Sequence, residues 1–492
     1  FYNGTTTANK LFVPMDYIIG GAEKAGMGWQ MLVEQLSIGR AISLPTSGTG
    51  AARLSALTSG AYARVRRQFG LPIAEFEGVG DALTQAAGYA YMTEASRVFT
   101  LSLIDKLGAK PAVASAILKY HLTDMGQKAT INAMDVQAGK AVMTGPKNMI
   151  ADSYLAAPVN ITVEGANILT RNMLIYGQGA IRCHPWVLKE MQSLDIEGEA
   201  GVVAFDEALW SHLGFAMSNA SRSLVHGLTG ARFAGAKDSP MKRYYQHFSR
   251  YSAVLALLSD SAMFTLGGSL KFREKLSARL GDLLSYVYID SAVLKHWEDQ
   301  GRPEEDRALV EYSCQWLLHE LQIAADGVLK NLPARPVAWI LRGLVFPLGQ
   351  RFDAPSDKLG GKVADLITKP SGTRDRMAEN MFVATDTNYA PALCYKAMAE
   401  ALRVEPLENK VLKAAKKGKI GTIVERQVAE AVEAGVITSA EGEDLQKVRD
   451  LIFEVITTDD FHPSELSDTP SKYNTHPDLR KAREAAETPK AA

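Results

Sequence analysis

The pair Glu164-Gly165 has the residue types and setting best suited to chemistry. It lies in the segment 163–171, which follows a long helical region and opens another helix. A carboxylate at a loop-to-helix junction can act as a general base, and the glycine after it leaves room for a ligand. The plainer alternative is a first-turn glutamate that is stabilised by the positive end of a helix. The rest of the chain has to decide between these two interpretations.

Composition and charge narrow the class of protein. The 492 residues predict more than one domain, and a formal net charge of -1 gives no indication of nucleic-acid binding. The three cysteines are too far apart for a disulfide framework or a zinc site, which favours a reducing compartment: Cys183, Cys314 and Cys394. The chain opens Phe1-Tyr2-Asn3-Gly4, without Met or a signal-peptide pattern, so we expect it to begin inside a domain.

The apolar periodicity of the first half predicts mainly helices. A strand-like signal covers residues 5–20, and a glycine-rich turn after it leads into the first helix. Pro45 should kink or interrupt that helix. We expect a helical bundle and then a non-helical connector over 139–163. The helices of the bundle are predicted over about 29–62, 78–107 and 111–138.

The second half predicts further helices, over 280–296 and 303–332 among others. The apolar stretch 251–270 contains Asp260 and several serines, so we expect a buried helix rather than a membrane span. For the apolar segment 337–348 we favour a core helix over an interfacial membrane anchor, which Trp339 would also suit.

Two charged or polar stretches follow. The basic run 410–419 favours a solvated helix face over a lipid or nucleic-acid contact. The polar tail over 458–492 is expected to be disordered.

The histidines give no metal motif. His184 stands beside Cys183, but no second His or Cys follows at ligand spacing. We therefore predict no metal site and a structural role for His184, and equally for His121, His226 and His319.

Taken together, the strand-to-helix opening, the loop 66–70 and the Glu164-Gly165 pair resemble the acyl-CoA dehydrogenase family. Over residues 5–190 their order and spacing match the end of its middle β domain and its C-terminal helical domain. The remainder resembles the extra C-terminal region of the large bacterial enzymes of fatty-acid degradation. The resemblance implies a mainly α fold with four parts: a remnant of the middle β domain (1–25), a C-terminal four-helix bundle (26–190), a second helical domain (191–457) and the tail (458–492).

The resemblance also assigns candidate site residues. It implies that Glu164 is the catalytic base, that Gly165 contacts the cofactor and that Arg40 belongs to the substrate site. In some relatives the base stands immediately before the arginine that corresponds to Arg40; that position is Gly39 here, which strengthens Glu164. Ala166 stands where the family has a threonine that contacts the flavin.

Two further segments are implied to bind FAD. Arg66, Gln68 and Phe69 fall on the segment that in the family binds the pyrophosphate and adenine half of FAD across the dimer interface. Gly139 is the one glycine kept from a second FAD-contacting motif. In that motif Asp135 replaces a glutamine, and Ala138 and Ala141 replace glycines.

The implied function is FAD-dependent α,β-dehydrogenation of medium- or long-chain acyl-CoA to trans-2-enoyl-CoA in fatty-acid β-oxidation. Implied partners are an electron acceptor such as an electron-transfer flavoprotein and a second copy in a homodimer. The expected location is cytoplasmic, with peripheral attachment to the inner face of the bacterial inner membrane as an option. The alternatives are an acyl-CoA oxidase and a non-catalytic helical scaffold that has lost the flavin. Because the family's N-terminal domain and most of its β domain have no counterpart here, we expect the chain as given to be an incomplete, inactive fragment.

Overall fold

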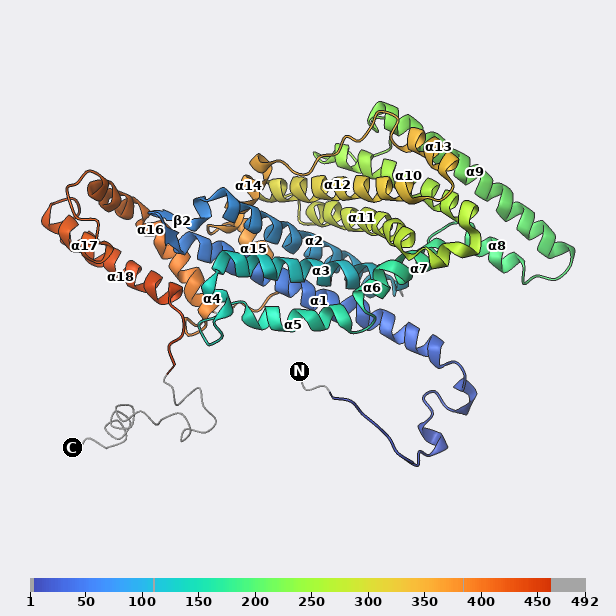
Figure 1. The fold of residues 1–492 in the computed structure, drawn as a ribbon, viewed down its shortest axis with the longest axis horizontal. Coiled ribbons are helices and arrows are strands. Elements are labelled where there is room, and N and C mark those ends of the chain that lie inside the picture. Colours follow the sequence, from blue (N-terminus) through green and yellow to red (C-terminus); the bar gives the residue numbers. More distant parts are fainter. Residues whose placement is uncertain (1–3, 109–110, 384, 462–492) are drawn as a thin grey trace.

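The computed structural model describes residues 4–108, 111–383 and 385–461 and is built almost entirely of helices (Figure 1). The molecule is elongated, with α16, α17 and α18 at one end and the long helix α9 at the other. The N-terminal bundle contains α1 (Gly28–Val65), α2 (Glu77–Leu107), α3 (Ala112–Gln137), α4 (Gly139–Val142), α5 (Ala151–Thr162) and the continuous run α6 (Asn167–Leu169), η4 (Thr170–Ile175) and α7 (Tyr176–Arg182).

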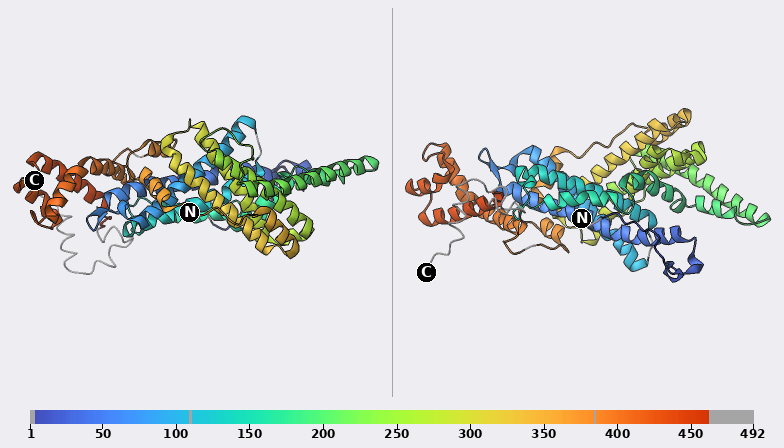
Figure 2. Two further views of the ribbon diagram at one scale, coloured as in Figure 1. Left: turned by 90° about the horizontal axis from the view of Figure 1, so that it is seen from above. Right: turned by 60° about the horizontal axis from the view of Figure 1, so that its bottom comes forward.

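The remaining helices form a layer against this bundle and a separate group at its end. The layer consists of α8 (Val187–Ser193), α9 (Glu199–Thr229), α10 (Lys242–Leu266), α11 (Glu274–Asp299), α12 (Arg307–Asn331), α13 (Arg335–Val345), α14 (Asp357–Ile367) and α15 (Gly372–Ala378). The end group consists of α16 (Ala390–Lys416), α17 (Val424–Glu433) and α18 (Ser439–Ile456). In the views of Figure 2, α9 extends away from the rest of the molecule.

Helices α1 and α3 run side by side in the same direction. Near their middle the backbones touch at Gly48 and Leu122, where a Cβ added to Gly48 would lie 2.3 Å from the Leu122 carbonyl oxygen. Towards their C-terminal ends, the Gln137 side chain donates a hydrogen bond to Ser59 at 3.3 Å. Because the two helices are parallel, residues from both of them that are far apart in the sequence lie close together at each end of the pair.

One hydrophobic core joins the bundle to the layer above it. Helix α2 lies between α1 and α3 on one side and α11, α12 and α14 on the other. Its packing is close, because a Cβ on Gly88 would lie 2.4 Å from the Tyr312 ring of α12. The end group α16–α18 has a smaller second core of its own.

The predicted helices of the bundle are confirmed, but two local predictions were wrong. The strand-like pattern over 5–20 forms no strand: among the described residues of that segment there is one short 3-10 turn, η1 (Met15–Tyr17), and the side chains of Phe12 and Ile19 are exposed. A strand needs hydrogen bonds from a neighbouring strand. The described chain pairs strands only in the hairpin β1 (Arg67–Gln68) and β2 (Leu71–Pro72).

The connector over 139–163 is also not irregular, because it contains α4 and α5. The side chain of Asn148 makes this possible by capping both helices. Its amide nitrogen donates to the carbonyls of Lys140 and Ala141 at 2.9 Å, and its oxygen accepts from the backbone N–H of Ala151 at 2.7 Å. Helix α1 continues through Pro45, and the kink predicted there stays a prediction.

The apolar segments of the second half form helices with one buried face. Helix α10 buries Tyr251, Val254 and Leu258, as expected; together with the turn after it, α10 is long and apolar enough to cross a membrane by length and composition alone. In α13, Ala338 and Leu341 are buried, whereas Trp339 is 66% exposed. The predicted disordered tail lies almost wholly outside the described residues.

Candidate active site

Glu164 lies in the connection between α5 and α6, three residues before α6 begins at Asn167. It is therefore not the first-turn helix residue of the plainer interpretation. Its φ is +53° and that of Gly165 is +95°, so two successive residues have left-handed backbones. This conformation is unfavourable for a residue with a side chain and persists where the surroundings impose it.

Lys119 of α3 contacts this turn directly. Its Nζ donates hydrogen bonds to the Gly165 carbonyl and to Oδ1 of Asn167, both at 2.7 Å. Asn167 Nδ2 donates in turn to Oγ1 of Thr123 at 3.0 Å, and Thr170 Oγ1 donates to the Gly165 carbonyl at 3.2 Å. Lys119 is completely buried. Its position beside Glu164 was not predicted from the sequence.

The Glu164 carboxylate is half-buried, and its Oε2 is buried without a hydrogen-bond partner. Arg40 of α1 approaches from the other side: a Cβ on Gly165 would lie 3.8 Å from its Nη2. Burial lowers the pKa of Arg40, and the negative charge of Glu164 partly offsets this. Burial also lowers the pKa of Lys119 to about 8, with a further lowering by Arg40 and an opposing effect of Glu164. The Glu164 carboxylate thus lies near two cations, the buried Lys119 and the half-buried Arg40.

The other predicted site residues gather at the opposite end of α1 and α3. Arg66 follows the last residue of α1, Gln68 lies in the β1–β2 hairpin, and Phe69 at its tip is 93% exposed with φ +50°. Gly139 follows α3 at the same end. Ala138 keeps a positive φ of +52°, and a Cβ on Gly139 would meet no atom within 4 Å.

The structure therefore separates the predicted residues into two groups. Glu164, Gly165 and Arg40 form one, near the N-terminal part of α1, and the residues around Arg66 form the other. Arg40 and Arg66 are 26 positions apart along the helix, about 39 Å at 1.5 Å per residue. A single copy of the chain does not bring the two groups together.

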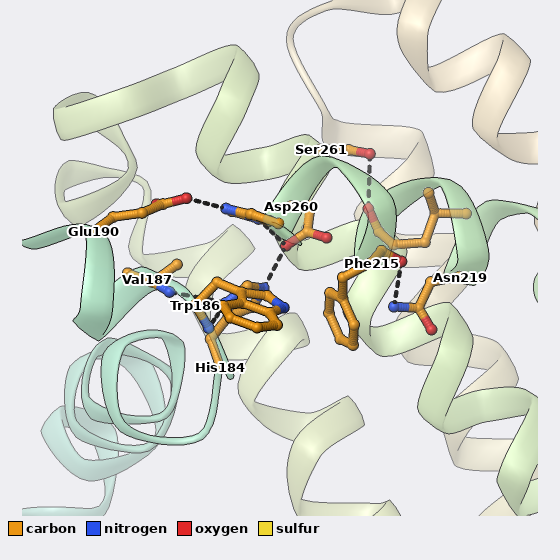
Figure 3. A network of polar contacts seen from close by, with 10 residues as sticks. His184, Trp186, Val187, Glu190, Phe215, Asn219, Asp260 and Ser261 are labelled. Carbon is orange, nitrogen blue, oxygen red and sulfur yellow. Dashed lines mark hydrogen bonds and ion pairs between the residues drawn. The ribbon is translucent and has the colours of Figure 1, made fainter. Parts of the chain in front are cut away.

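His184 has partners that its sequence neighbourhood did not show (Figure 3). Its Nε2 lies 2.9 Å from Oδ1 of Asp260 in α10. His212 of α9 bridges two carboxylates: its Nε2 lies 3.3 Å from the same Asp260 oxygen, and its Nδ1 lies 2.8 Å from Oε1 of Glu190 in α8. The three residues that join His184 in this cluster come from three separate helices, as Figure 3 shows for Glu190 and Asp260.

The hydrogen bonds of this cluster favour a structural tie over a metal site. The backbone N–H groups of Trp186 and Val187 both point to Nδ1 of His184 at 3.2 Å, so the ring proton belongs on Nε2, facing Asp260. Nε2 then offers no lone pair to a metal ion. We interpret the cluster as a hydrogen-bond network that holds α8 and α9 against α10.

Two of the other histidines, His121 and His319, have ordinary structural surroundings. His121 packs between the rings of Tyr120 and Tyr286, and burial lowers its pKa to about 3, so it is uncharged at neutral pH. His319 Nδ1 lies 2.9 Å from the carbonyl oxygen of Phe352. Their predicted structural role stays a prediction.

Comparison with known proteins identifies the family. The protein-family model for the bacterial-type acyl-CoA dehydrogenase C-terminal region matches residues 181–461, more than half of the chain. The chain belongs to the acyl-CoA dehydrogenase family. The model for the acyl-CoA dehydrogenase C-terminal domain matches residues 26–177, which include the Glu164 turn and the Arg66 hairpin.

Individual relatives are distant. The probable acyl-CoA dehydrogenase FadE10 of Mycobacterium tuberculosis is 24% identical over 407 residues, which cover 79% of this chain and 60% of that protein. A crystal structure of an acyl-CoA dehydrogenase complexed with FAD from Bacillus anthracis is similar in fold, with a TM-score of 0.52 and 17% identity over 68% of this chain and 55% of that one. A stretch of 61 residues, 12% of this chain, is 52% identical to 36% of the protein HemX of Proteus mirabilis. The chain thus spans about three fifths of the curated acyl-CoA dehydrogenase that it matches.

Proposed function

We propose that the protein containing this chain catalyses the FAD-dependent α,β-dehydrogenation of medium- or long-chain acyl-CoA, with Glu164 as the base that removes the α proton. The observation that carries the proposal is the buried Oε2 of Glu164, which accepts no hydrogen bond and lies in a left-handed turn beside Gly165. An ionised carboxylate oxygen is a hydrogen-bond acceptor, and no donor from the described part of the chain occupies this one, so it is free to take a proton. Membership of the family supports the class of reaction.

The residues around the turn have separate parts in this chemistry. Glu164 takes the α proton of the thioester on its unpartnered oxygen. The run that begins with α6 has first N–H groups without acceptors in the helix, which suits them to the thioester oxygen, where negative charge develops. Gly165 adds no side chain between the carboxylate and the substrate. Bound FAD would supply the acceptor for the hydride that leaves the β carbon.

The group around Arg66 fits the part of a dinucleotide cofactor that the family resemblance assigns to it. Arg66 offers a cation for the pyrophosphate, Phe69 an exposed aromatic ring, and Gly139 a backbone that is open to close approach. Because this group lies about 39 Å from Arg40 along α1, it cannot complete the Glu164 site of its own chain. We therefore propose a homodimer in which each centre combines Glu164 and Arg40 of one copy with the Arg66 hairpin and Gly139 of the other.

The proposal extends to partners and location. The electron acceptor is an electron-transfer flavoprotein, and the enzyme is cytoplasmic. The outward-facing Trp339 and Ile340 of α13, which are 66% and 67% exposed, support peripheral attachment to the inner membrane.

Anaerobic reduction of the flavin tests the proposed activity. Octanoyl-CoA or palmitoyl-CoA added to the purified full-length protein is expected to bleach the visible flavin band, and an electron-transfer flavoprotein is expected to restore it. Rapid restoration by air alone would identify an oxidase instead. A colourless protein that does not take up added FAD would favour the non-catalytic scaffold.

A further inference from the structure

A buried lysine lies beside the proposed base. Lys119 has no exposed surface, and the charged groups that face it are Arg40 from α1 and Glu164 from the connection before α6. Burying an ammonium group is costly unless its hydrogen bonds are satisfied. Lys119 satisfies two of them on one short segment, at the Gly165 carbonyl and at the Asn167 side chain.

These two hydrogen bonds span the strained part of the backbone. Gly165 has a φ of +95° and follows Glu164 at +53°, while Asn167 begins α6. A cation donating to both sides of Ala166 fixes the peptide groups between them, and charge-assisted bonds are stronger than neutral ones. Thr123, one turn along α3 from Lys119, accepts from the other side of the Asn167 amide at 3.0 Å. The turn is thus bound at two neighbouring positions of one rigid helix.

We propose that Lys119 is a positioning residue that holds the Glu164–Gly165 turn in its left-handed form and places a positive charge beside the Glu164 carboxylate. This inference rests on the proposed role of Glu164 as the base. The same network supports the segment at Ala166, where the side chain has no hydroxyl to make a contact of its own.

The charge and the geometry have different measurable consequences. A nearby cation favours the ionised carboxylate, so its removal keeps the base protonated to higher pH. Loss of the two hydrogen bonds frees the turn, so that Glu164 spends less time aimed at the substrate. Misplacement of a catalytic group by about 1 Å can cost up to about a hundredfold in rate.

The test compares Lys119→Met, Lys119→Arg and Asn167→Ala in the full-length protein with FAD. Lys128→Met is the matched control, because Lys128 lies on the same helix, has a side chain that is 56% exposed and forms an ion pair with Asp124 at 2.8 Å. Hydrogen–deuterium exchange of the segment 163–170 reports the turn without reference to activity. The pH dependence of kcat/KM, and kcat and KM separately, report the base.

For Lys119→Met we expect faster exchange over 163–170, a fall in kcat of about tenfold to a hundredfold with little change in KM, and an acid limb of kcat/KM at higher pH. Lys119→Arg should restore the acid limb, and Asn167→Ala should speed exchange to a smaller extent. Lys128→Met should match the wild type in both readouts.

Exchange and pH profiles of Lys119→Met and Asn167→Ala that equal those of Lys128→Met would overturn the proposal. Exchange that quickens as expected in a protein whose Glu164→Gln variant keeps full turnover would instead contradict the role of Glu164, while leaving Lys119 as the residue that holds the turn.

Discussion

The crossing of α1 and α3 gives a sharp prediction about how the site is held. At Gly48 an added Cβ would lie 2.3 Å from the Leu122 carbonyl oxygen, and at Gly126 it would lie 2.4 Å from the Gly48 carbonyl oxygen. These are backbone atoms, which cannot rotate out of the way. Gly48→Ala must therefore push the two helices apart. The crossing lies between Arg40 and the C-terminal half of α1, and Leu122 is one turn from Lys119.

The magnitude follows from two opposing effects. Alanine in place of glycine inside a helix stabilises it by about 1 kcal/mol, whereas overpacking a close contact costs about 1–3 kcal/mol. Gly50 is the control, because a Cβ there would meet nothing within 4 Å. Gly50→Ala should therefore gain up to about 1 kcal/mol, and Gly48→Ala should lose up to about 2 kcal/mol after the helix gain is subtracted.

Equilibrium urea unfolding of both variants measures the difference. We expect Gly48→Ala to have the lower midpoint and, in its native state, faster hydrogen exchange over 163–170, because Leu122 at the crossing is one turn from Lys119, which binds the turn. Equal or greater stability of Gly48→Ala compared with Gly50→Ala would refute the backbone contact between the two helices.

Three further predictions address the cofactor, the buried lysine and the membrane. Arg66→Ala should weaken FAD retention in gel filtration, and cofactor content equal to that of the wild type would count against the pyrophosphate contact. Because the pKa of Lys119 is about 8 in the folded chain and 10.5 when unperturbed, the unfolded chain binds more protons between these values. The free energy of unfolding therefore gains a contribution that rises with pH in that window, by at most about 3 kcal/mol. Lys119→Met should lack this rise in urea titrations that are compared with the wild type. Finally, replacing Trp339 and Ile340 by serine should reduce the fraction of the protein that floats with anionic vesicles. If the wild-type protein does not float, α13 is a core helix only.

The sequence predicted those features that depend on local pattern. The bundle helices follow from apolar periodicity. Glu164-Gly165 was singled out because the glycine leaves room for a ligand and because the pair resembles the family's motif; its left-handed backbone was not predicted. Lys119 was not recognisable, because a lysine in a helix is normally exposed and its partners lie 46 and 48 positions further on. The capping role of Asn148 was missed for a related reason: the Gly-Pro and Ala-Pro pairs around it favour irregular structure, and only the folded backbone shows which N–H and carbonyl groups it satisfies.

The cluster around His184 shows the same limit. Its ligand-type partners come from α8, α9 and α10, so no spacing rule within the sequence could assemble them. The strand-like segment over 5–20 shows the converse, since alternation of apolar residues is not sufficient for a strand when the described part of the chain offers no neighbouring strand to pair with it.

Turnover by Glu164→Gln is the most direct test of the central claim. Glutamine preserves the size of the side chain and removes its ability to accept the α proton. We expect the variant of the full-length protein to bind FAD and acyl-CoA like the wild type and to show almost no anaerobic flavin reduction by acyl-CoA. Flavin reduction at a rate close to that of the wild type would contradict Glu164 as the base.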